Sequence, residues 1–380
     1  MIRVALSTSV VQGGRSGVAS YVFGLLDGLA RIEAPVQMIL VGLEGDRPLF
    51  ERWLGRCEWS GVAERWRPAL RNVLWHQTAL RGRLRSVRAD VLHIPSYRRI
   101  VWRAPCPQVV TIHDCAAFAV KGKYDLARMV YGRQVVTRLA RGADTVMTVS
   151  AATADDVARH FGLPRDALHV VWNGIDRARF RPPAPAEVAA FRARRAAPYF
   201  LYLARLEHPA KNHVRLIAAF EEFAARHPAD RHELLFGGAD WHGAEQVHAR
   251  IAASPCAARI HALGFVDLAD LPLWYAGATA MVYPSLFEGF GLPPAEAMAC
   301  GCPVICSTRG SLGEVVGDAA RLVDPEDVPG MADALAELAV PAAREAWRER
   351  GLARAALFDW NETARKVTTL YQVAARRPHA

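Results

Sequence analysis

Residues 278–307, ATAMVYPSLFEGFGLPPAEAMACGCPVICS, contain a complete strand–helix–strand pattern. An apolar run at 278–285 leads into a loop with Gly289 and Gly291. Pro293, Pro294 and the helix-compatible AEAMAC follow, before a second apolar run at 303–310. Proline suits the first turn of a helix, where its missing N–H costs nothing. Two apolar strands joined by one helix indicate a parallel sheet, so this segment predicts an α/β fold.

The same alternation of short apolar runs and helix-length segments continues along the whole chain. Twelve runs are predicted as strands, at 2–9, 37–43, 89–96, 107–114, 143–150, 167–174, 199–206, 232–239, 259–266, 278–285, 303–310 and 319–325. Residues 177–198 are rich in proline and charge, which is typical of a domain junction. We therefore expect two doubly wound, Rossmann-like domains facing a central cleft, with ligands beyond the carboxyl ends of the strands.

Composition limits the classes of protein that fit. The chain has 380 residues, of which 52% are hydrophobic and 22% charged, which suits two globular domains. The opening MIRVALSTSV predicts a first strand and lacks the basic start of a signal peptide. No apolar run approaches the roughly 18 residues needed to span a bilayer. The seven cysteines form no CxxC pair, which favours reduced thiols and a cytoplasmic location.

The net charge of +9 is concentrated in the first half of the chain. Residues 1–178 hold 25 basic against 15 acidic residues, whereas residues 179–380 hold 22 against 23. Between Arg65 and Arg103 lie ten arginines and one acid, Asp90. This stretch is interpreted either as a solvated arginine-rich face or as a surface for anionic membranes or nucleic acid.

The sequence LRGRLRSVR, residues 80–88, bears on that choice. In a helix, Leu80, Leu84 and Val87 share one face, and arginines 81, 85 and 88 lie beside them. This is the pattern of a helix lying on a membrane surface, so peripheral contact with an anionic membrane is one hypothesis for the Arg65–Arg103 region.

Glu288 and Glu296 flank the glycine-rich loop of the opening segment. A pair of carboxylates suggests acid–base hydrolysis of a glycosidic bond, but the two occupy different elements. Glu288 is predicted in the loop and Glu296 in the first turn of the helix, where an acid also complements the helix dipole. Glycines let backbone amides approach a ligand, and a helix N-terminus attracts phosphate. A carboxylate beside phosphate can accept hydrogen bonds from ribose, so we expect a nucleotide site.

Arg205 and Lys211 supply cations at the end of the run at 199–206. An arginine fork and a lysine point charge both suit a diphosphate, although each could equally be a solvated surface charge.

The first half offers weaker patterns. Gly13 and Gly14 lie between a predicted strand and helix, but the spacing is not GxGxxG. His113 and Asp114 end the run at 107–114, without the GxSxG elbow of a hydrolase. They are interpreted either as site residues or as a packed or capping pair.

Four segments together resemble the family 4 glycosyltransferases, retaining GT-B enzymes that use nucleotide-sugar donors. They are LGFVDLADLPLWYAGATAMVYPSLFEGFGLPPAEAMACGCPVICS (263–307), YLARLEHPAKNH (202–213), VVWNGIDRARFRP (170–182) and SLGEVVGDAARLVDPED (311–327). The resemblance is strong over about residues 89–375 and looser over 1–88. It implies a GT-B fold, with residues 1–178 and the last helix, 359–380, forming an acceptor domain and residues 179–358 a donor domain.

The resemblance also implies a role for each candidate residue. Glu296 would bind the ribose, and Arg205 and Lys211 the diphosphate. Glu288 would lie near the donor sugar, with the amides of Phe290, Gly291 and Leu292 close by. In the first domain, His113 would lie near the transferred sugar, and the loop of Gly13 and Gly14 would close on the donor. No cofactor or obligatory metal is implied, and the chain has no DxD pair.

The expected activity is therefore transfer of a hexose with retention, catalysed by Glu288, His113, Arg205 and Lys211. The donor first expected is GDP-mannose, with UDP-sugars second. The acceptor would be a saccharide or a lipid-linked sugar in surface polysaccharide or lipopolysaccharide assembly, on the inner face of the cytoplasmic membrane. The alternatives are a GT-B epimerase or phosphorylase, or a non-catalytic nucleotide-sugar binder. Nucleic acid is not the expected partner of the basic half.

Overall fold

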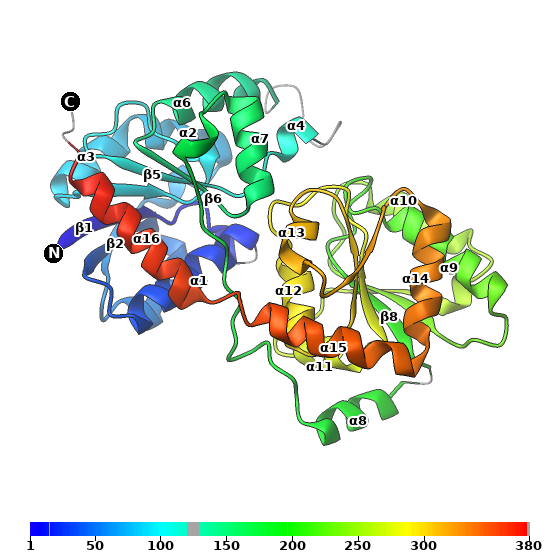
Figure 1. Cartoon of the computed structure of the whole chain (residues 1–380). Helices are drawn as coiled ribbons and strands as arrows, with labels where there is room; N and C mark the ends of the chain where they lie inside the picture. The colour runs from blue at the N-terminus through cyan, green and yellow to red at the C-terminus, as the bar shows by residue number, and fades with distance from the viewer. Residues whose placement is uncertain (15, 120–128, 196, 378–380) are drawn as a thin grey trace. The chain divides into compact units, whose positions relative to one another are not determined.

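The computed structural model describes residues 1–14, 16–119, 129–195 and 197–377. The chain divides into two compact units, one formed by Met1–Gly174 with Asp359–Ala380 and the other by Ile175–Phe358 (Figure 1). The division predicted from the sequence lies four residues later, after residue 178. The proline-rich junction, including helix α8 (Pro185–Ala193), thus belongs to the second unit.

The first unit contains a parallel sheet that is seven-stranded within the described residues, in the order β3-β2-β1-β4-β5-β6-β7. Its strands are β1 (Ile2–Ser7), β2 (Val36–Leu43), β3 (Glu58–Val62), β4 (Val91–Ile94), β5 (Gln108–Ile112), β6 (Thr145–Thr148) and β7 (Leu168–Val170). Its main helices are α1 (Gly17–Arg31), α2 (Ala69–Gln77), α3 (Ala79–Ser86), α4 (Ala116–Ala119), α6 (Thr137–Arg141), α7 (Ala151–Phe161) and α16 (Trp360–Ala375). Strand order reverses between β1 and β4, as in a doubly wound fold.

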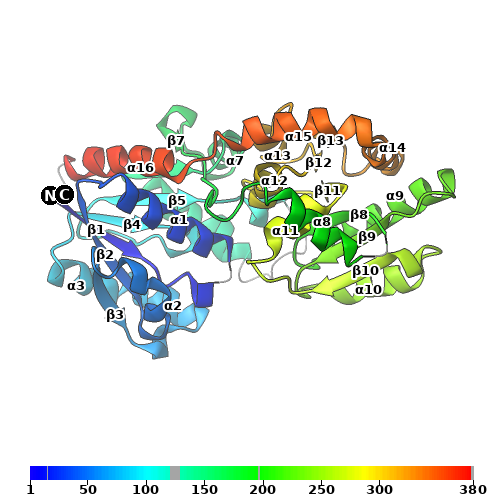
Figure 2. The ribbon, with the colours of Figure 1, turned by 90° about the horizontal axis from the view of Figure 1, so that it is seen from below.

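The last helix, α16, packs against α1, and Figures 1 and 2 show the two side by side. One face of α16 is an apolar stripe that is buried throughout, at Trp360, Ala364, Val367, Leu370 and Tyr371. Gly24 and Gly28 of α1 give Trp360 its room, because a Cβ on either would collide with it.

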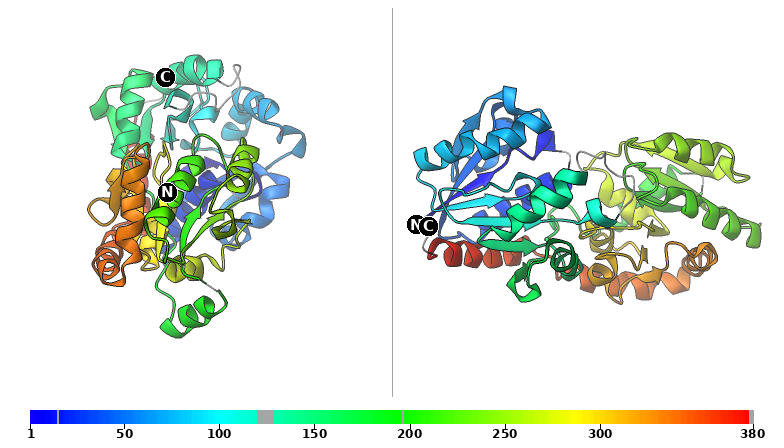
Figure 3. Two further views of the ribbon diagram at one scale, coloured as in Figure 1. Left: turned by 90° about the vertical axis from the view of Figure 1, so that its right-hand side faces the viewer. Right: turned by 90° about the horizontal axis from the view of Figure 1, so that it is seen from above.

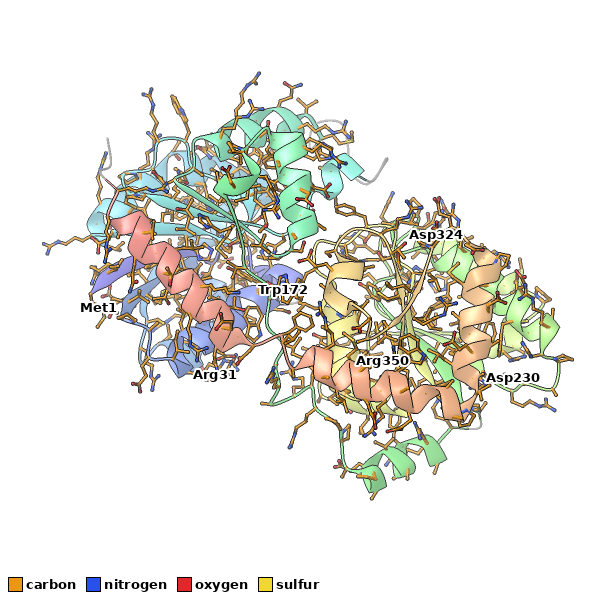
Figure 4. The ribbon with its side chains drawn as sticks, viewed as in Figure 1. Met1, Arg31, Trp172, Asp230, Asp324 and Arg350 are labelled. Atoms are coloured by element: carbon orange, nitrogen blue, oxygen red, sulfur yellow. The ribbon has the colours of Figure 1, made fainter. Side chains whose placement is uncertain are left out.

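Hydrogen bonds fasten the start of α16 to this unit. Thr363 Oγ1 donates to the carbonyl of Trp172 at 2.7 Å, and Arg31 Nε donates to Asn361 Oδ1 at 3.0 Å. Trp172 and Arg31 are labelled in Figure 4. The last helix thereby completes a unit that begins 359 residues earlier in the chain.

The second unit repeats this plan with a parallel sheet, six-stranded in the described part, in the order β10-β9-β8-β11-β12-β13. Its strands are β8 (Tyr199–Leu203), β9 (Glu233–Gly237), β10 (Ile260–Gly264), β11 (Ala280–Tyr283), β12 (Val304–Ser307) and β13 (Arg321–Val323). Its other helices are α9 (His213–Arg226), α10 (Ala244–Ala252), α11 (Leu271–Gly277), α12 (Leu292–Ala299), α13 (Leu312–Val316), α14 (Val328–Ala339) and α15 (Pro341–Ala355). Figure 2 and the right-hand view of Figure 3 show the orange α15 and the green α10 on opposite sides of this sheet.

The predicted α/β fold with two Rossmann-like sheets is confirmed. Each of the twelve predicted runs overlaps one of the strands, and only β2 extends beyond its run, by one residue at Val36. The sequence analysis missed β3 at the edge of the sheet. In its sequence, EWSGV, polar and apolar residues are mixed, so it contains no continuous apolar run. An edge strand is bonded on one side only, so it needs no continuous apolar run.

One predicted surface is wrong. Residues 79–86 do form helix α3, but Leu80 and Leu84 are 0% and 1% exposed. The apolar face of α3 is therefore part of the protein core and is unavailable to a membrane. Its arginines extend from the other side, and Arg83 Nη2 donates to the carbonyl of Gly61 at 3.1 Å.

Two further features bear on the sequence-based expectations. All seven cysteines are free thiols. No helix among the described residues is both long and apolar enough to cross a membrane.

The packing of Trp360 against α1 predicts opposite effects of two glycine-to-alanine changes. Gly24→Ala should lower the free energy of unfolding by about 1–3 kcal/mol, because a methyl group there overlaps the indole. Gly82→Ala is the matched control, since it lies within α3 with open space around its Cβ. That change should stabilise the chain by about 0.5–1 kcal/mol through helix propensity. Thermal and urea unfolding measure both, and equal effects would contradict this account of α16.

Candidate functional site

The loop between β11 and α12 is shaped by one glycine. Gly291 has a φ of 95°, in the left-handed region, and precedes the first residue of α12. A Cβ there would collide with Leu312 of α13. Glycine is therefore required both by the backbone conformation and by the close approach of Leu312.

This loop leaves backbone donors free at a helix N-terminus. In the described part of the chain, no hydrogen bond from the N–H groups of Phe290, Gly291 or Leu292 is found. The first N–H groups of any helix lack intrahelical partners, and the helix dipole places partial positive charge there. The three amides therefore suit an anionic group such as phosphate.

Glu288, in the same loop, forms an ion pair with Lys211. Lys211 Nζ lies 2.5 Å from Glu288 Oε1, and the two side chains are only 15% and 17% exposed. Tyr283 at the end of β11 donates to the same oxygen at 3.0 Å. Burial alone would raise the pKa of Glu288, but Lys211 and the hydrogen bonds from Ser285 and Tyr283 outweigh it, so that this pKa is lowered. Glu288 is therefore a carboxylate at neutral pH.

Lys211 is held by a second loop, which follows β8 and is tied to the first. The backbone N–H of Leu286 donates to the carbonyl of Ala210 at 3.0 Å. Tyr202 Oη donates to the carbonyl of Lys211 itself at 2.7 Å. The two loops thus form one platform at the carboxyl edge of the sheet, where the parallel fold predicts a ligand site.

Arg205 lies on the loop after β8 and is half exposed. Its Nη2 lies 3.4 Å from Glu207 Oε2, and its Cζ lies 4.6 Å from the ring centre of Trp241. Trp241 is itself 57% exposed and follows β9. A cation above an indole is attracted by the ring's π electrons, so Trp241 helps to orient the guanidinium.

Glu296 occupies a different environment from Glu288. It is the fifth residue of α12, in the second turn, so its predicted place in the first turn is wrong. The helix starts before the prolines, at Leu292, because Gly291 ends the loop. Tyr275 Oη donates to Glu296 Oε2 at 3.3 Å. Burial raises the pKa of Glu296 to about 7, although the hydrogen bond from Tyr275 and the charge of Arg179 lower it.

In the first unit, the candidate residues lie at the carboxyl ends of β1 and β5. Gly13 and Gly14 have φ values of 77° and 82°, and the space around the Cβ position of Gly13 is open. Tyr21, on α1 directly after this loop, packs edge-on against His113 with ring centres 4.8 Å apart. The glycine loop and His113 are therefore linked by one aromatic contact.

His113 and Asp114 perform separate tasks. His113 Nε2 lies 3.0 Å from the carbonyl of Pro95, and burial lowers the pKa of the ring despite Asp114 and that carbonyl. His113 is thus neutral, with the proton on Nε2 facing Pro95 and Nδ1 left as an acceptor. Asp114 Oδ1 accepts a hydrogen bond from the N–H of Ala116 at 3.0 Å, the capping role considered in the sequence analysis.

Comparison with known proteins shows the family. "Glycosyltransferase Family 4" matches residues 15–179, and "Glycosyl transferases group 1" matches residues 197–340. The O-antigen chain mannosyltransferase B of Escherichia coli is 32% identical over 276 residues, 70% of each chain. The D-inositol 3-phosphate glycosyltransferase of Xylanimonas cellulosilytica is 32% identical over 265 residues, 66% of this chain and 61% of its own.

This chain is a family 4 glycosyltransferase. A solved structure of Anabaena Alr3699/HepE in complex with UDP and glucose has the same fold, with a TM-score of 0.77 and 17% identity. The match covers 98% of this chain and all of that one. The predicted GT-B resemblance is thereby confirmed.

The structure of this glycosyltransferase sorts the predicted site residues into two groups. Gly13, Gly14 and His113 belong to the first unit. The second unit holds Arg205, Lys211, Glu288, Phe290, Gly291, Leu292 and Glu296. Among the described residues, no group of three or more His, Cys, Asp or Glu side chains that could hold a metal ion is found.

Sequence reasoning missed the aromatic partners of the site. Tyr283 and Tyr275 each donate to one of the two glutamates, Tyr21 packs on His113, and Trp241 lies under Arg205. Tyr283 lies near the end of the predicted run at 278–285 and Trp241 lies two residues after the run at 232–239, where ligand-facing residues are expected. Nothing in their spacing shows which charged residue each one contacts.

The buried ion pair predicts a measurable coupling between Lys211 and Glu288. Lys211→Met alone should lower the free energy of unfolding by about 3 kcal/mol, because it leaves an uncompensated carboxylate. The double variant, Lys211→Met with Glu288→Gln, should lose clearly less free energy of unfolding. A double-mutant cycle in urea measures the difference. Asp333→Asn is the matched control, since Asp333 is 63% exposed in its pair with Arg226 and should matter little.

The pH dependence of that coupling follows from the lowered pKa of Glu288. The ion pair contributes stability above the ordinary carboxyl pKa of 4.5, and this contribution is lost as the pH falls through the lowered folded-state pKa. The difference between wild type and Lys211→Met should therefore shrink in acid. If the stability difference between the two proteins stayed constant down to low pH, the stabilisation by Lys211 would not be electrostatic in origin.

Proposed function

We propose that this glycosyltransferase moves a hexose from a nucleotide sugar to a saccharide or lipid-linked acceptor, with retention at the anomeric carbon. The observation that carries the proposal is the Lys211–Glu288 pair beside the free amides of Phe290, Gly291 and Leu292. It combines a cation and donors for a diphosphate with a carboxylate for sugar hydroxyls. Transfer of mannose from GDP-mannose is the form we favour, in surface polysaccharide or lipopolysaccharide assembly.

The leaving diphosphate would be held by positive charge without a metal or other cofactor. Lys211 and Arg205 supply two full charges, and the amides at the start of α12 add partial charges from a fixed direction. Such donors stabilise the charge that builds on the departing nucleoside diphosphate without having to reorganise. Trp241 keeps the half-exposed Arg205 oriented before the donor arrives.

The two glutamates would hold different parts of the donor. Glu288 is ionised and anchored by Tyr283, so it can accept hydrogen bonds from sugar hydroxyls while Lys211 contacts phosphate. Glu296 would accept hydrogen bonds from the ribose hydroxyls, which favours its ionised form. We propose that the acceptor hydroxyl attacks on the face that the diphosphate leaves, through an oxocarbenium-like transition state. The new C–O bond forms as the bond from the anomeric carbon to the diphosphate oxygen breaks, and the hydroxyl proton passes to that departing oxygen.

His113 and the loop of Gly13 and Gly14 keep the roles that the family resemblance implies. Nδ1 of His113 is left as an acceptor, which suits a hydrogen bond from a sugar hydroxyl. The open space at Gly13 suits a backbone that approaches the donor closely.

The choice of sugar and acceptor rests on the relatives. The Escherichia coli O-antigen chain mannosyltransferase supports mannose and a polysaccharide product. The UDP and glucose named for the Anabaena structure support UDP-sugars as the second possibility. A lipid-linked acceptor would place the enzyme at the cytoplasmic face of a membrane, which is our proposal for its location.

An exposed apolar stripe supports contact with that membrane, on a helix different from the one expected. Leu70 and Leu74 of α2 are 86% and 55% exposed, and Trp102 is 59% exposed. Leu70, Leu74 and Gln77 share one face of α2 by their spacing. The side chain of Gln77 accepts from the N–H of Trp102 at 3.0 Å, so the stripe continues from α2 onto Trp102.

Arginines lie beside this apolar stripe. Arg103 lies 4.9 Å from the ring centre of Trp102, and Arg81 donates to the Trp102 carbonyl. Arg71 lies next to Leu70, and among the described residues no carboxylate partner of Arg71 or Arg103 is found. Leucine and tryptophan that enter the headgroup region, with arginines for anionic lipid, would give two additive sources of binding. We propose that this surface docks on an anionic bilayer.

Variants of the two glutamates test the donor site. The full chain is first screened by thermal shift against GDP-mannose, UDP-glucose and other nucleotide sugars, because a bound donor raises the melting temperature by mass action. With the donor found, Glu296→Gln should weaken nucleoside-diphosphate binding by about tenfold. Glu288→Gln should lower kcat far more than it weakens binding. Wild-type transfer by Glu288→Gln would refute its proposed role, and no response to any nucleotide sugar would refute the proposal as a whole.

The pH dependence of binding separates the ribose role of Glu296 from a structural one. If ribose binds the ionised form of Glu296, a protonated Glu296 must lose its proton when the donor binds. The affinity for the donor should therefore fall as the pH drops below about 7. Glu296→Gln should remove this dependence. A wild-type affinity that does not change between pH 6 and pH 8 would contradict the assignment.

Vesicle sedimentation tests the membrane surface. Leu70→Ser with Leu74→Ser and Trp102→Ser should reduce partitioning onto phosphatidylglycerol vesicles by about tenfold or more, because insertion energy scales with apolar area. Leu357→Ser with Val373→Ser is the matched control, since these exposed side chains lie on other elements. Equal binding by the triple variant and wild type would refute the docking surface.

A further inference from the structure

A cavity of about 430 Å³ lies at the amino-terminal edge of the second sheet, away from the donor residues. Ala278 and Thr279, which line it, directly precede β11, and Pro303 directly precedes β12. Lys211 and Glu288 follow strands and so lie at the other edge of the same parallel sheet. The proposed function therefore leaves this cavity unexplained.

The cavity is lined by basic side chains. Arg192 comes from α8, and Arg344 and Arg348 come from α15. An adjoining cavity of about 320 Å³ shares Arg192, Thr279 and Arg344 and adds Arg195. Among the described lining residues of both cavities the only acid is Glu345, which already pairs with Arg348 at 2.8 Å.

Arg344 is the residue that most needs an explanation. It is half-buried, and within the described residues it has no hydrogen bond or ion pair. Its pKa is lowered by burial and then by the charge of Arg192, so two guanidinium groups lie near each other with no carboxylate that compensates them. Elsewhere on this unit arginines bridge to acids, as Arg309 does to Asp324, which is labelled in Figure 4.

Arg192 is fixed in place before any ligand binds. Its Nε and Nη2 donate to the carbonyls of Gly277 and Ala276, each at 3.0 Å. These bonds hold the plane of the guanidinium and leave Nη1 without a partner among the described atoms. A side chain that is already ordered loses less entropy when it binds an anion.

We propose that this cavity binds a small soluble phosphate ester, held by Arg192 and Arg344. Guanidinium groups match phosphate oxygens through paired N–H donors, and two of them balance a doubly charged phosphate. Pro182, Pro183 and Pro303 form an apolar wall that suits the organic part of such a molecule. The site is separate from the donor site and does not depend on which sugar is transferred.

Titration calorimetry with inorganic phosphate tests the site on the full chain. Wild type should bind phosphate at two classes of site, one of which survives Arg205→Ser, a change confined to the donor side. Arg344→Ser with Arg192→Ser should weaken the surviving class by about tenfold or more, since each lost charge-assisted hydrogen bond is strong. Arg344→Lys should bind phosphate more tightly than Arg344→Ser, because lysine keeps the positive charge, but less tightly than wild type.

Two outcomes would overturn the proposal. One is phosphate binding that the Arg344→Ser, Arg192→Ser variant retains in full. The other is phosphate binding that Arg205→Ser alone abolishes, which would assign all of it to the donor side. Melting temperatures show that the variants fold, and unchanged donor binding by Arg344→Ser separates this result from a failure of the proposed function.

Discussion

The ion pair between Lys211 and Glu288 joins the two loops on which the second-unit site is built. Removing both charges from water is costly, and that cost is offset only when geometry is close and the remaining lone pairs are satisfied. The contact is close, at 2.5 Å, and Tyr283 adds a hydrogen bond to the same carboxylate oxygen. The pair fixes both charges before any ligand binds, so in the proposed donor site a diphosphate would meet a cation and amides that are already oriented.

Most strands were predictable from the sequence because parallel strands lie inside the protein, covered on both faces by helices. Strands buried on both faces need continuous apolar runs, and twelve such runs were visible. The strand that was missed, β3, lies at the sheet edge and includes Glu58 and Ser60. The surroundings of a helix face are harder to predict, because an amphipathic pattern does not show what covers its apolar side. Leu80 and Leu84 had the right spacing for a surface helix, yet they pack into the core.

The location of the charged candidate residues was also predictable, because strand ends and helix starts place them at one edge of a sheet. Their aromatic partners were not, since Tyr275 and Glu296 are 21 residues apart and Arg205 and Trp241 lie on different loops. Contacts of this kind depend on how loops fold back, which leaves no periodic pattern in sequence. The start of α12 was misplaced for a similar reason, because Gly291 ends the loop before the two prolines do.

The net charge of a half-chain says little about how charges are paired within it. The second half of the chain is nearly neutral, with 22 basic and 23 acidic residues, yet it holds both the Lys211–Glu288 pair and an arginine-lined cavity. In the first case a carboxylate already compensates the cation, and in the second Arg344 has no carboxylate partner among the described residues. Screening makes distant charges irrelevant to a bound ligand beyond about 10 Å. Whether a cation is already paired with a nearby acid is therefore visible only in the folded structure.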